Sequence, residues 1–413
     1  MTRETRCVNL DWLEVYAHEP LSLPRDPDYF RSQGFVVRER EYGTRVYNQM
    51  FTLEDREGHP FIEVRREPKS EVIAKNSCHI RLHNRTCYYN NAAEIMREFL
   101  QRYNFTFVSI SRVDICLDFE YFDSGDDPHN FMIRYINGVF SKINQANISA
   151  HGADRWERRN WNSLSWGSPT SDVGTKMYDK TLELYDSISQ SYKKPYIRQA
   201  WQACGLIDDW QYCTKVKPDG SVYKPAIWRV EFSIRSSVKG WFVINPDGHE
   251  RKKHSVRNTL DMYDTKPKLL VMFFSLARHY FHFKYYEEGV RKDNCRDKIL
   301  FKPKKVEYFY KIDKAQVANE KTSDRKYSSL LVALKRYRDT TTNAEVRKSC
   351  TVLIEHISRS ISAMEAGANV SPQELRAWHY AAEMVFAGDD RVFTAVLDEA
   401  RSTLKLHRDV GYF

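Results

Sequence analysis

Residues Phe105 to Glu120 read FTFVSISRVDICLDFE, and this stretch decides the fold. From residue 112 onward polar and apolar residues alternate, which is the period of a β-strand with two different faces. The polar positions of one face are Arg112, Asp114, Cys116, Asp118 and Glu120. A second stretch, AIWRVEFSIR at residues 226–235, repeats the pattern with Arg229, Glu231, Ser233 and Arg235. Each strand is therefore expected to bury an apolar face and to present a charged one.

Shorter elements surround these two strands. Apolar runs separated by turn signals predict short strands at 35–37, 45–47, 61–64 and 78–83. Apolar residues three or four positions apart predict helices at 92–103, 128–145 and 266–286. Residues 161–178 read as a hairpin followed by a helix, and residues 205–225 read as a loop. The sequence thus predicts an α+β fold with a central antiparallel sheet and flanking helices.

The character of the chain changes from about residue 315. Apolar residues at helical spacing follow, namely Val346, Cys350, Leu353, Ile357, Ile361 and Met364. Ser371-Pro372-Gln373-Glu374 is typical of a helix start. We expect one domain at 1–312, with core motifs at 105–240 and a basic, aromatic helix region at 251–311. An all-helical accessory domain is expected at 313–413.

Composition indicates a globular protein that binds a polyanion. The chain has 413 residues, of which 14% are aromatic, and a net charge of +9. Residues 251–311 hold 16 Lys and Arg against 7 Asp and Glu, among them Lys302, Lys304 and Lys305. A local excess of cations is typical of a face for nucleic acid, and a solvated basic surface is the alternative. The sequence has no membrane-spanning apolar run and no signal peptide at its start, so a cytoplasmic protein is expected.

The cysteines do not predict a metal site. The eight thiols form no C-x-x-C pair. Cys78 and Cys87 lie near His79 and His83, but their nine-residue spacing matches no common zinc finger. We interpret the cysteines as separate thiols in a reducing compartment.

Tyr178 is the candidate nucleophile. It ends the predicted hairpin, and Lys176 would share its face if the strand continues, as would Lys180. These cations would stabilise a phenolate or bind a phosphate. Gly174 precedes the tyrosine and permits a close approach of backbone. A packing role, the commoner use of a tyrosine, is the alternative.

The acidic residues of the two strands are candidate metal ligands. Carboxylate oxygens suit Mg²⁺ or Mn²⁺, ions that hold a phosphate and neutralise its charge. Asp114 and Asp118 lie about 13 Å apart along a strand, so one ion would not easily bind both. Asp114 is favoured because it matches Glu231, each two residues after an arginine. Cross-strand ion pairs without a metal are the alternative.

A segment that mixes cations with aromatic rings lies between the two strands. It contains Arg155, Arg158, Arg159 and Trp161. Stacking combined with charge is how proteins hold single-stranded nucleic acid, although surface packing would produce the same composition.

Three motifs together resemble the replication initiation factor family, the rolling-circle initiators and relaxases of plasmids, transposons and phages. They are SRVDICLDF at 111–119, WGS at 166–168 running to MYDKTLE at 177–183, and WRVE at 228–231. The resemblance implies a tyrosine nucleophile at Tyr178. It also implies metal binding by Glu231 with Asp114 or Asp118, with Asp179 as a further candidate.

The resemblance also has consequences for the fold. It implies an endonuclease-like nicking domain in which carboxylates replace the paired histidines of the His-hydrophobic-His enzymes. Family members often have arginine two residues before the tyrosine, where this chain has Lys176, which keeps the charge and loses the bidentate fork. The helical C-terminal part is not covered by the resemblance.

The sequence therefore predicts a rolling-circle replication initiator. Tyr178 would attack a phosphodiester at an origin, which forms a 5′-phosphotyrosine link with the help of Mg²⁺ or Mn²⁺. Arg112 and Arg229 are further expected DNA contacts. The expected partner is origin DNA, duplex and single-stranded, with a host helicase, a polymerase and a second copy of the chain as further candidates. A conjugative relaxase, a non-catalytic origin-binding regulator and a general metal-dependent nuclease are the alternatives.

Overall fold

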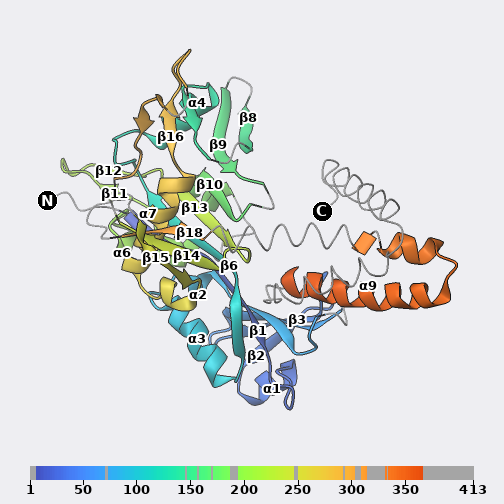
Figure 1. The fold of residues 1–413 in the computed structure, drawn as a ribbon. Helices are drawn as coiled ribbons and strands as arrows, with labels where there is room; N and C mark the ends of the chain where they lie inside the picture. The colour runs from blue at the N-terminus through green and yellow to red at the C-terminus, as the bar shows by residue number, and fades with distance from the viewer. Residues whose placement is uncertain are drawn as a thin grey trace.

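The structure is a computed structural model (Figure 1). It describes residues 6–365 except 70–72, 145–146, 156–157, 169–170, 187–193, 246–249, 292–293, 303–307, 314–330 and 333.

A large antiparallel sheet organises the described residues. Its ten strands follow the order β2-β3-β4-β5-β1-β6-β13-β10-β9-β8. In Figure 1 the sheet runs from β8 and β9 at the top to β2 and β3 at the bottom. The strands are β1 (Arg6–His18), β2 (Val36–Glu39), β3 (Tyr47–Glu54), β4 (Pro60–Pro68), β5 (Ser77–Leu82), β6 (Thr106–Phe119), β8 (Ile148–Arg155), β9 (Arg158–Trp166), β10 (Val173–Asp179) and β13 (Trp228–Arg235).

Helices and smaller sheets complete the fold. The helices are α1 (Pro27–Ser32), α2 (Asn84–Cys87), α3 (Ala92–Arg102), α4 (Pro128–Ile136), α5 (Lys180–Asp186), α6 (Lys194–Ala203), α7 (Lys266–Tyr280) and α9 (Ala344–Glu365), with a 3-10 turn η2 (Leu260–Tyr263). One small sheet joins β15 (Glu250–Arg257), β14 (Gly240–Ile244) and β18 (Phe309–Ile312). Another joins β17 (Asp297–Lys298), β16 (Phe283–Tyr285) and β7 (Phe140–Lys142), and β11 (Lys215–Val216) pairs with β12 (Val222–Tyr223).

The predicted α+β fold with a central antiparallel sheet is confirmed. The two patterned stretches became β6 and β13, which lie side by side, and the hairpin became β9 and β10. The predicted helix at 92–103 is α3. The prediction missed β1, although this strand lies between β5 and β6 near the middle of the sheet.

The predicted helix at 128–145 is too long. Asp127 caps α4 by accepting a hydrogen bond from the amide of Asn130 at 2.8 Å, and Pro128 occupies the first turn. The helix ends at Ile136, because Gly138 has a φ of +79° and this left-handed conformation stops a helix. The following apolar residues form β7.

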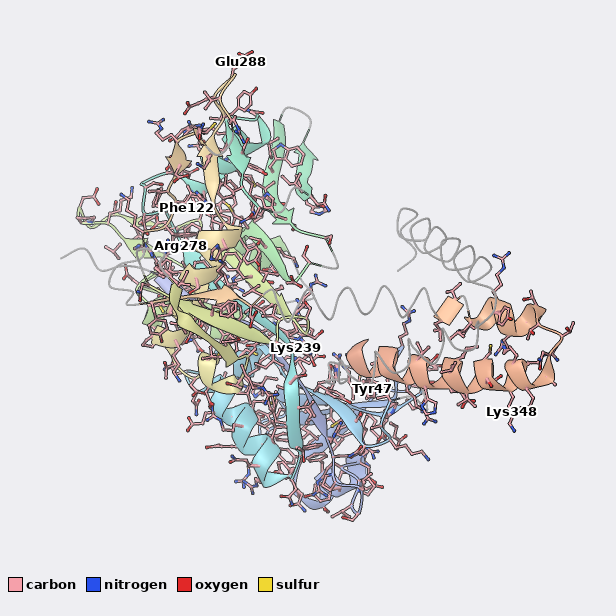
Figure 2. All side chains as sticks on the ribbon, viewed as in Figure 1. Tyr47, Phe122, Lys239, Arg278, Glu288 and Lys348 are labelled. Carbon is pink, nitrogen blue, oxygen red and sulfur yellow. The ribbon has the colours of Figure 1, made fainter. Side chains whose placement is uncertain are left out.

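The apolar face of the sheet carries the main core. The side chains of Ile115, Leu117, Val230 and Phe232 are fully buried there, in one cluster with Phe273 of α7. Phe122 belongs to the same cluster and lies within the body of the molecule in Figure 2. The predicted aromatic helix at 266–286 is too long, because α7 ends at Tyr280 and Phe283–Tyr285 form β16; the helix itself packs in the core. Strands β16 and β17 also lie in the basic region 251–311.

The opposite face of β6 and β13 is polar and only partly covered. A second apolar cluster lies over one end of it, formed by α6, the end of α5 and the loop after α6, with Trp201 and Ile197 at its centre. Trp201 contacts Asp118 on the polar face. The charged residues of both strands therefore share one side of the sheet, as their alternation predicted.

The C-terminal part contains the predicted helical pattern. In α9, Cys350 and Ile357 are fully buried, whereas Lys348 is exposed and points outward in Figure 2. The helix start predicted at Ser371 lies outside the described residues, and the domain division at 312 stays a prediction. Within the described part of the chain, no helix has both the length and the apolar character that crossing a bilayer requires.

Candidate active site

The register of the sheet arranges the predicted site residues in transverse rows on the polar face. One row contains Asp118, Arg229 and Tyr178, from β6, β13 and β10. The next row contains Cys116, Glu231 and Lys176. Neighbouring rows are two residues apart on each strand, about 7 Å. The two patterned strands and the hairpin thus bring the predicted nucleophile and acids to one place.

Tyr178 contacts Glu231 directly. The phenol hydroxyl donates a hydrogen bond to Oε2 of Glu231 at 3.1 Å. Burial raises the pKa of Tyr178 well above its ordinary value, and the negative charge of Glu231 adds to this effect. The guanidinium of Arg229 acts in the opposite direction. In this state the phenol keeps its proton and shares it with a carboxylate.

Glu231 is a buried acid among other acids. Burial, together with the negative charges of Asp114 and Asp11, raises the pKa of Glu231 to about 7. Burial also raises the pKa of Asp114, although the guanidinium of Arg112 lowers it. Like charges held close together and away from water resist ionisation together. A cation placed among these carboxylates would relieve their repulsion.

We expect Glu231→Gln to remove a pH-dependent loss of stability in the metal-free protein. The carboxyl titrates near pH 4.5 when unfolded and near 7 when folded. The folded state therefore holds the proton more strongly than the unfolded state. This adds to the free energy of unfolding, fully below about pH 4.5, and the contribution disappears as the pH rises to about 7. The wild type should therefore lose roughly 3 kcal/mol of its free energy of unfolding across this range, and Glu231→Gln should not. Urea unfolding between pH 4.5 and 8 measures it.

The control for this prediction is Glu288→Gln, at an exposed position. Its free energy of unfolding should follow the wild type at every pH. If the difference between wild type and Glu231→Gln is constant across the window, the raised pKa of Glu231 is wrong.

Asp11 belongs to the site and was missed by the sequence prediction. The register of β1 against β6 slips between Leu10 and Trp12, so Asp11 is the extra residue of a β-bulge. Its Oδ1 accepts hydrogen bonds from Nη1 of Arg229 at 3.0 Å and from the hydroxyl of Tyr88 at 3.1 Å. One signal was present, an acid inside the apolar run NLDWL at 9–13. The bulge itself has no such signal.

Arg229 and Asp118 form a cross-strand ion pair, the alternative that the sequence left open. Both side chains are 0% exposed. Nε and Nη2 of Arg229 donate to the two carboxylate oxygens of Asp118 at 2.6 and 2.7 Å. Trp201 donates its indole N–H to Oδ2 of Asp118 at 2.7 Å. These bonds engage both oxygens of Asp118.

The predicted DNA contact of Arg229 is therefore wrong in this structure. Besides Asp118, its guanidinium donates to Asp11 and, at 2.6 Å, to the hydroxyl of Tyr88. A buried guanidinium with these partners has no surface to offer to DNA. Its positive charge acts instead on the tyrosine beside it.

Asp114 is held by Arg112. Nε and Nη2 of Arg112 donate to its two oxygens at 2.9 and 2.5 Å. The Asp114 carboxylate is buried, whereas the Arg112 side chain is 38% exposed. An ionised carboxylate has further lone pairs beyond two hydrogen bonds, so Asp114 keeps the capacity to bind a cation.

The two lysines occupy different positions around Tyr178. Lys176 is exposed and lies opposite Glu231 in the register. The strand ends at Asp179, so Lys180 begins α5 instead of continuing the face. Nζ of Lys180 nevertheless lies 5.4 Å from the centre of the Tyr178 ring and forms an ion pair with Glu183. Oδ1 of Asp179 accepts the backbone N–H of Leu182 at 2.8 Å, which makes Asp179 a helix cap.

The mixed basic and aromatic segment forms the tip of the β8–β9 hairpin. Arg155 pairs with Arg158 in the register, and Arg159 follows in β9. The side chains of these arginines lie outside the described part of the structure. Trp161 is half-buried and packs against the main core, so part of its ring is used for packing.

The predicted basic contacts at 302–305 are described only at their start. Lys302 is exposed, and its backbone N–H donates to Asp123 at 2.6 Å. Lys304 and Lys305 lie outside the described residues, so their contact with DNA stays a prediction.

A group of three metal-ligating side chains lies elsewhere, in the turn between β3 and β4. Ligand atoms of Asp55, Glu57 and His59 are within 4.8 Å of one another. Asp55 and Glu57 face the guanidinium of Arg85 at 3.7 Å, and Asp55 accepts two backbone N–H groups of its own turn. These contacts account for the cluster without an ion.

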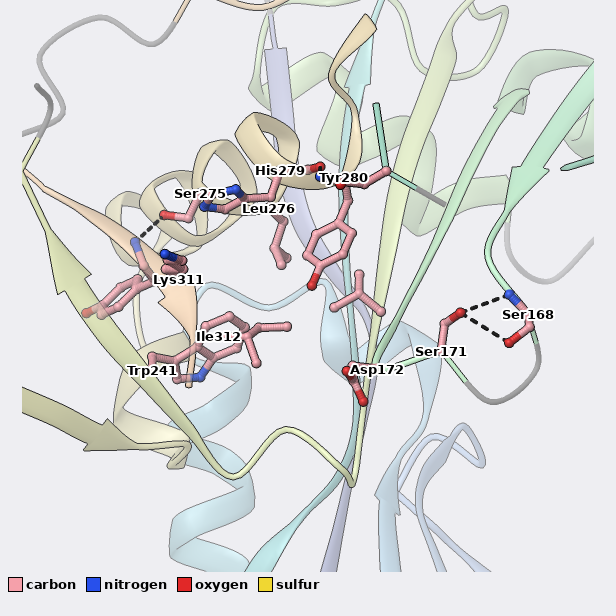
Figure 3. A pocket seen from close by; sticks show the side chains of 13 residues that line it. Ser168, Ser171, Asp172, Trp241, Ser275, Leu276, His279, Tyr280, Lys311 and Ile312 are labelled. Atoms are coloured by element: carbon pink, nitrogen blue, oxygen red, sulfur yellow. Dashed lines mark hydrogen bonds between the residues drawn. The ribbon is translucent and has the colours of Figure 1, made fainter. Parts of the chain in front are cut away.

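A cavity of about 520 Å³ lies between α7, β14, β18 and the start of β10 (Figure 3). Its lining includes Asp172, Trp241, Tyr280 and Lys311. None of the catalytic candidates lines it. The candidate site therefore lies on the polar face of the sheet, apart from this cavity.

Comparisons with known proteins leave the family open. No protein-family model matches the chain, and no curated protein matches it. Among solved structures, the chain is similar to the rolling circle replication initiator protein from Geobacillus stearothermophilus, with 12% identity and a TM-score of 0.41. The likeness covers 71% of this chain and 93% of that chain. At this identity and TM-score we draw no conclusion from it, and the resemblance to replication initiation factors stays a prediction carried by the three motifs.

Proposed function

We propose that the chain is a metal-dependent enzyme that nicks DNA and initiates rolling-circle replication, with Tyr178 as the nucleophile. The observation that carries the proposal is the hydrogen bond between the phenol of Tyr178 and Glu231, within a cluster of acids. Tyr88 also donates to a carboxylate, that of Asp11, and Tyr178 differs in that the pKa of its partner Glu231 is raised to about 7. Such a pair is what proton removal from a phenol requires.

The acids of the site have the chemistry of divalent-cation ligands. In this state they are not gathered around one point, since the group of three whose ligand atoms lie within 4.8 Å of one another among the described residues is Asp55, Glu57 and His59. We propose that an ion draws the carboxylates of the site together. Asp114 and Glu231, with Asp11, supply carboxylate oxygens, the ligands that Mg²⁺ and Mn²⁺ prefer. Burial raises the pKa of both Asp114 and Glu231, and negative charge adds to it, from Asp11 on Asp114 and from Asp114 and Asp11 on Glu231. Of the two aspartates, Asp114 is the better candidate for a metal ligand, because Asp118 already neutralises Arg229. When bound, the ion would polarise the scissile phosphate and neutralise its charge.

The residues of the chain then have separate roles. Glu231 takes the phenol proton as the Tyr178 oxygen attacks phosphorus. The bond from phosphorus to the 3′ oxygen breaks, which leaves a 5′-phosphotyrosine and a 3′ oxygen that takes up a proton from water. Lys180, close to the ring, stabilises charge on the phenol oxygen, and the exposed Lys176 binds the phosphate. Buried Arg229 holds Asp118 in place, and its positive charge lowers the pKa of the neighbouring Tyr178.

A test of the proposal is the formation of a covalent adduct. Supercoiled plasmid that carries the DNA flanking the gene is incubated with protein and Mg²⁺ or Mn²⁺. A nick and a protein–DNA adduct that survives denaturation are expected. Binding without a nick would instead indicate an origin-binding regulator, and nicking without an adduct a general nuclease.

Metal removal should stop the reaction. We expect EDTA to abolish nicking and added Mn²⁺ to restore it, because the acid cluster needs a cation to bind a phosphate. Asp114→Asn should lower nicking by about 10²-fold or more, since one charged ligand is lost. Asp55→Asn, in the other acidic group, is the matched control and should nick like the wild type. Equal loss in both variants would contradict the assignment of Asp114.

A further inference from the structure

Two cysteines far apart in the chain, Cys7 and Cys204, lie side by side in the fold. Cys7 is in β1 opposite Asp118, so it extends the transverse row that contains Asp118 and Tyr178. Cys204 directly follows α6, the helix that covers this end of the polar face. Cys7 belongs to the apolar cluster around Trp201, and Cys204 packs against the same cluster.

One backbone carbonyl group holds both residues in place. Sγ of Cys7 lies 3.4 Å from the carbonyl oxygen of Ala200. The backbone N–H of Cys204 donates to the same oxygen at 3.1 Å. Gly205 then ends the helix with a φ of +72°, the left-handed conformation that is common at this position. The end of α6 therefore fixes Cys204 against β1.

The two thiols also interact with each other. A hydrogen bond between them lowers the pKa of Cys204 and raises the pKa of Cys7. Burial adds to the rise at Cys7. At Cys204 the ammonium of Lys266 lowers the pKa further, whereas burial and the charge of Asp118 act against it. Cys204 is therefore the more readily ionised thiol, and Cys7 is its protonated partner.

The positive charge of Lys266 is held near this pair by Asn9. Nζ of Lys266 donates to Oδ1 of Asn9 at 2.5 Å. The amide of the same Asn9 donates through Nδ2 to Sγ of Cys7 at 3.1 Å. A cation close to a thiol favours the thiolate, which is the form that reacts.

Cys204 is also the cysteine that reagents in solution reach most easily. All eight cysteines lie in the described residues; seven are buried, and Cys204 is half-buried. A thiolate that is both favoured and accessible is the form most susceptible to oxidation. Burial raises the pKa of five others, namely Cys78, Cys87, Cys116, Cys213 and Cys350.

We propose that Cys7 and Cys204 form an oxidation site, at which hydrogen peroxide converts the two thiols into a disulfide that links α6 to β1. Cys204 is the thiol that the peroxide oxidises, and Cys7 is the thiol that closes the disulfide. In a reducing compartment such a bond is transient and reports oxidation. The inference is independent of the proposed function, because it involves neither Tyr178 nor a metal.

The reaction has two steps. The Cys204 thiolate attacks one oxygen of hydrogen peroxide, and the O–O bond breaks. The hydroxide that leaves takes up the proton that Cys204 had released and becomes water, while Cys204 becomes a sulfenic acid. The sulfur of Cys7 then attacks the sulfur of Cys204, the S–O bond breaks, and the hydroxide leaves as water with the proton of Cys7. The two thiols are oxidised by two electrons, and the peroxide is reduced to water.

The test counts thiols and maps the linkage in the wild-type protein. Reduced protein is treated with hydrogen peroxide, denatured, blocked with N-ethylmaleimide and digested, and its peptides are identified by mass spectrometry. Of the eight thiols, two should be lost in a linked pair of peptides that contain Cys7 and Cys204, and dithiothreitol should restore both. An unchanged number of thiols, loss of thiols only as higher oxides, or a disulfide between two copies of the chain overturns the proposal.

Three variants assign the roles of the two thiols. Cys204→Ser should keep all its remaining thiols under the same treatment. In Cys7→Ser the sulfenic acid at Cys204 has no partner, so dimedone should label it more strongly than in the wild type. Cys213→Ser, in the same apolar cluster, is the matched control and should still form the linked pair. Thiol loss in Cys204→Ser equal to the wild type, or dimedone labelling of Cys7→Ser equal to the wild type, contradicts the assignment.

The disulfide should also slow hydrogen exchange in α6. Once the end of this helix is covalently linked to the sheet, local opening of residues 194–203 becomes rarer, and their backbone amides exchange more slowly than in the reduced protein. Peroxide-treated Cys204→Ser is the control and should exchange at the rate of its untreated form. Equal exchange in oxidised and reduced wild type would show that the bond does not hold α6.

Discussion

Replacing Tyr178 by phenylalanine is expected to abolish the covalent adduct and to reduce nicking below detection. The substitution removes one oxygen, and that oxygen is both the proposed nucleophile and the donor to Glu231. Loss of a nucleophile from an enzyme of this kind lowers turnover on the order of 10⁶-fold. Gel assays of supercoiled DNA measure the nick, and denaturing gels measure the adduct.

The same variant should still bind DNA, because the substitution removes one oxygen and no positive charge. Tyr212→Phe, at a site 69% exposed, is the matched control and should nick normally. An adduct formed by Tyr178→Phe would contradict the assignment of the nucleophile, and another tyrosine would then carry the DNA.

Arg229→Met is expected to destabilise the fold by about 3 to 5 kcal/mol, since it leaves Asp118 as a buried charge without its partner. The free energy of unfolding of a native domain is only about 5 to 15 kcal/mol, so much of the protein would unfold under mild conditions. The result is measured by urea denaturation at pH 7. The loss arises from charge burial, not from lost DNA contact.

Two further variants test that reason. Arg229→Met combined with Asp118→Asn should recover part of the stability, because the second change removes the buried, unpaired charge of Asp118. Arg31→Met breaks the ion pairs of an arginine that is 46% exposed, with Asp28 and Glu39, and should leave the free energy of unfolding almost unchanged, because water screens these charges. A double variant as unstable as Arg229→Met alone would point to lost packing instead.

The alternation of residues was enough to predict which side chains share a face. In β6 and β13 a period of two separates Asp114 and Glu231 from the apolar core, and this separation is a local property of the strand. The hairpin that carries Tyr178 was predictable for the same reason. These elements placed Tyr178, the proposed nucleophile, beside Glu231.

The alternation of polar and apolar residues did not predict which elements cover the polar face of β6 and β13. Arg229 looked like a DNA contact, and it became a buried ion pair because α6 brings Trp201 over that end of the sheet. Asp11 was missed because β1 has slips in its register and because its bulge depends on pairing with β6. Contacts between segments far apart in the chain decide both cases.

The order of the central strands also determines when the site exists during synthesis. Strand β6 finds its partner β13 more than a hundred residues later in the chain, and β10 pairs with β13 as well. A nascent polypeptide that has left the ribosome only as far as the tyrosine lacks Glu231 and the strand that aligns it. The proposed active site therefore assembles late, as one long-range event, and an unfinished chain lacks the strand pairing on which the proposed nicking depends.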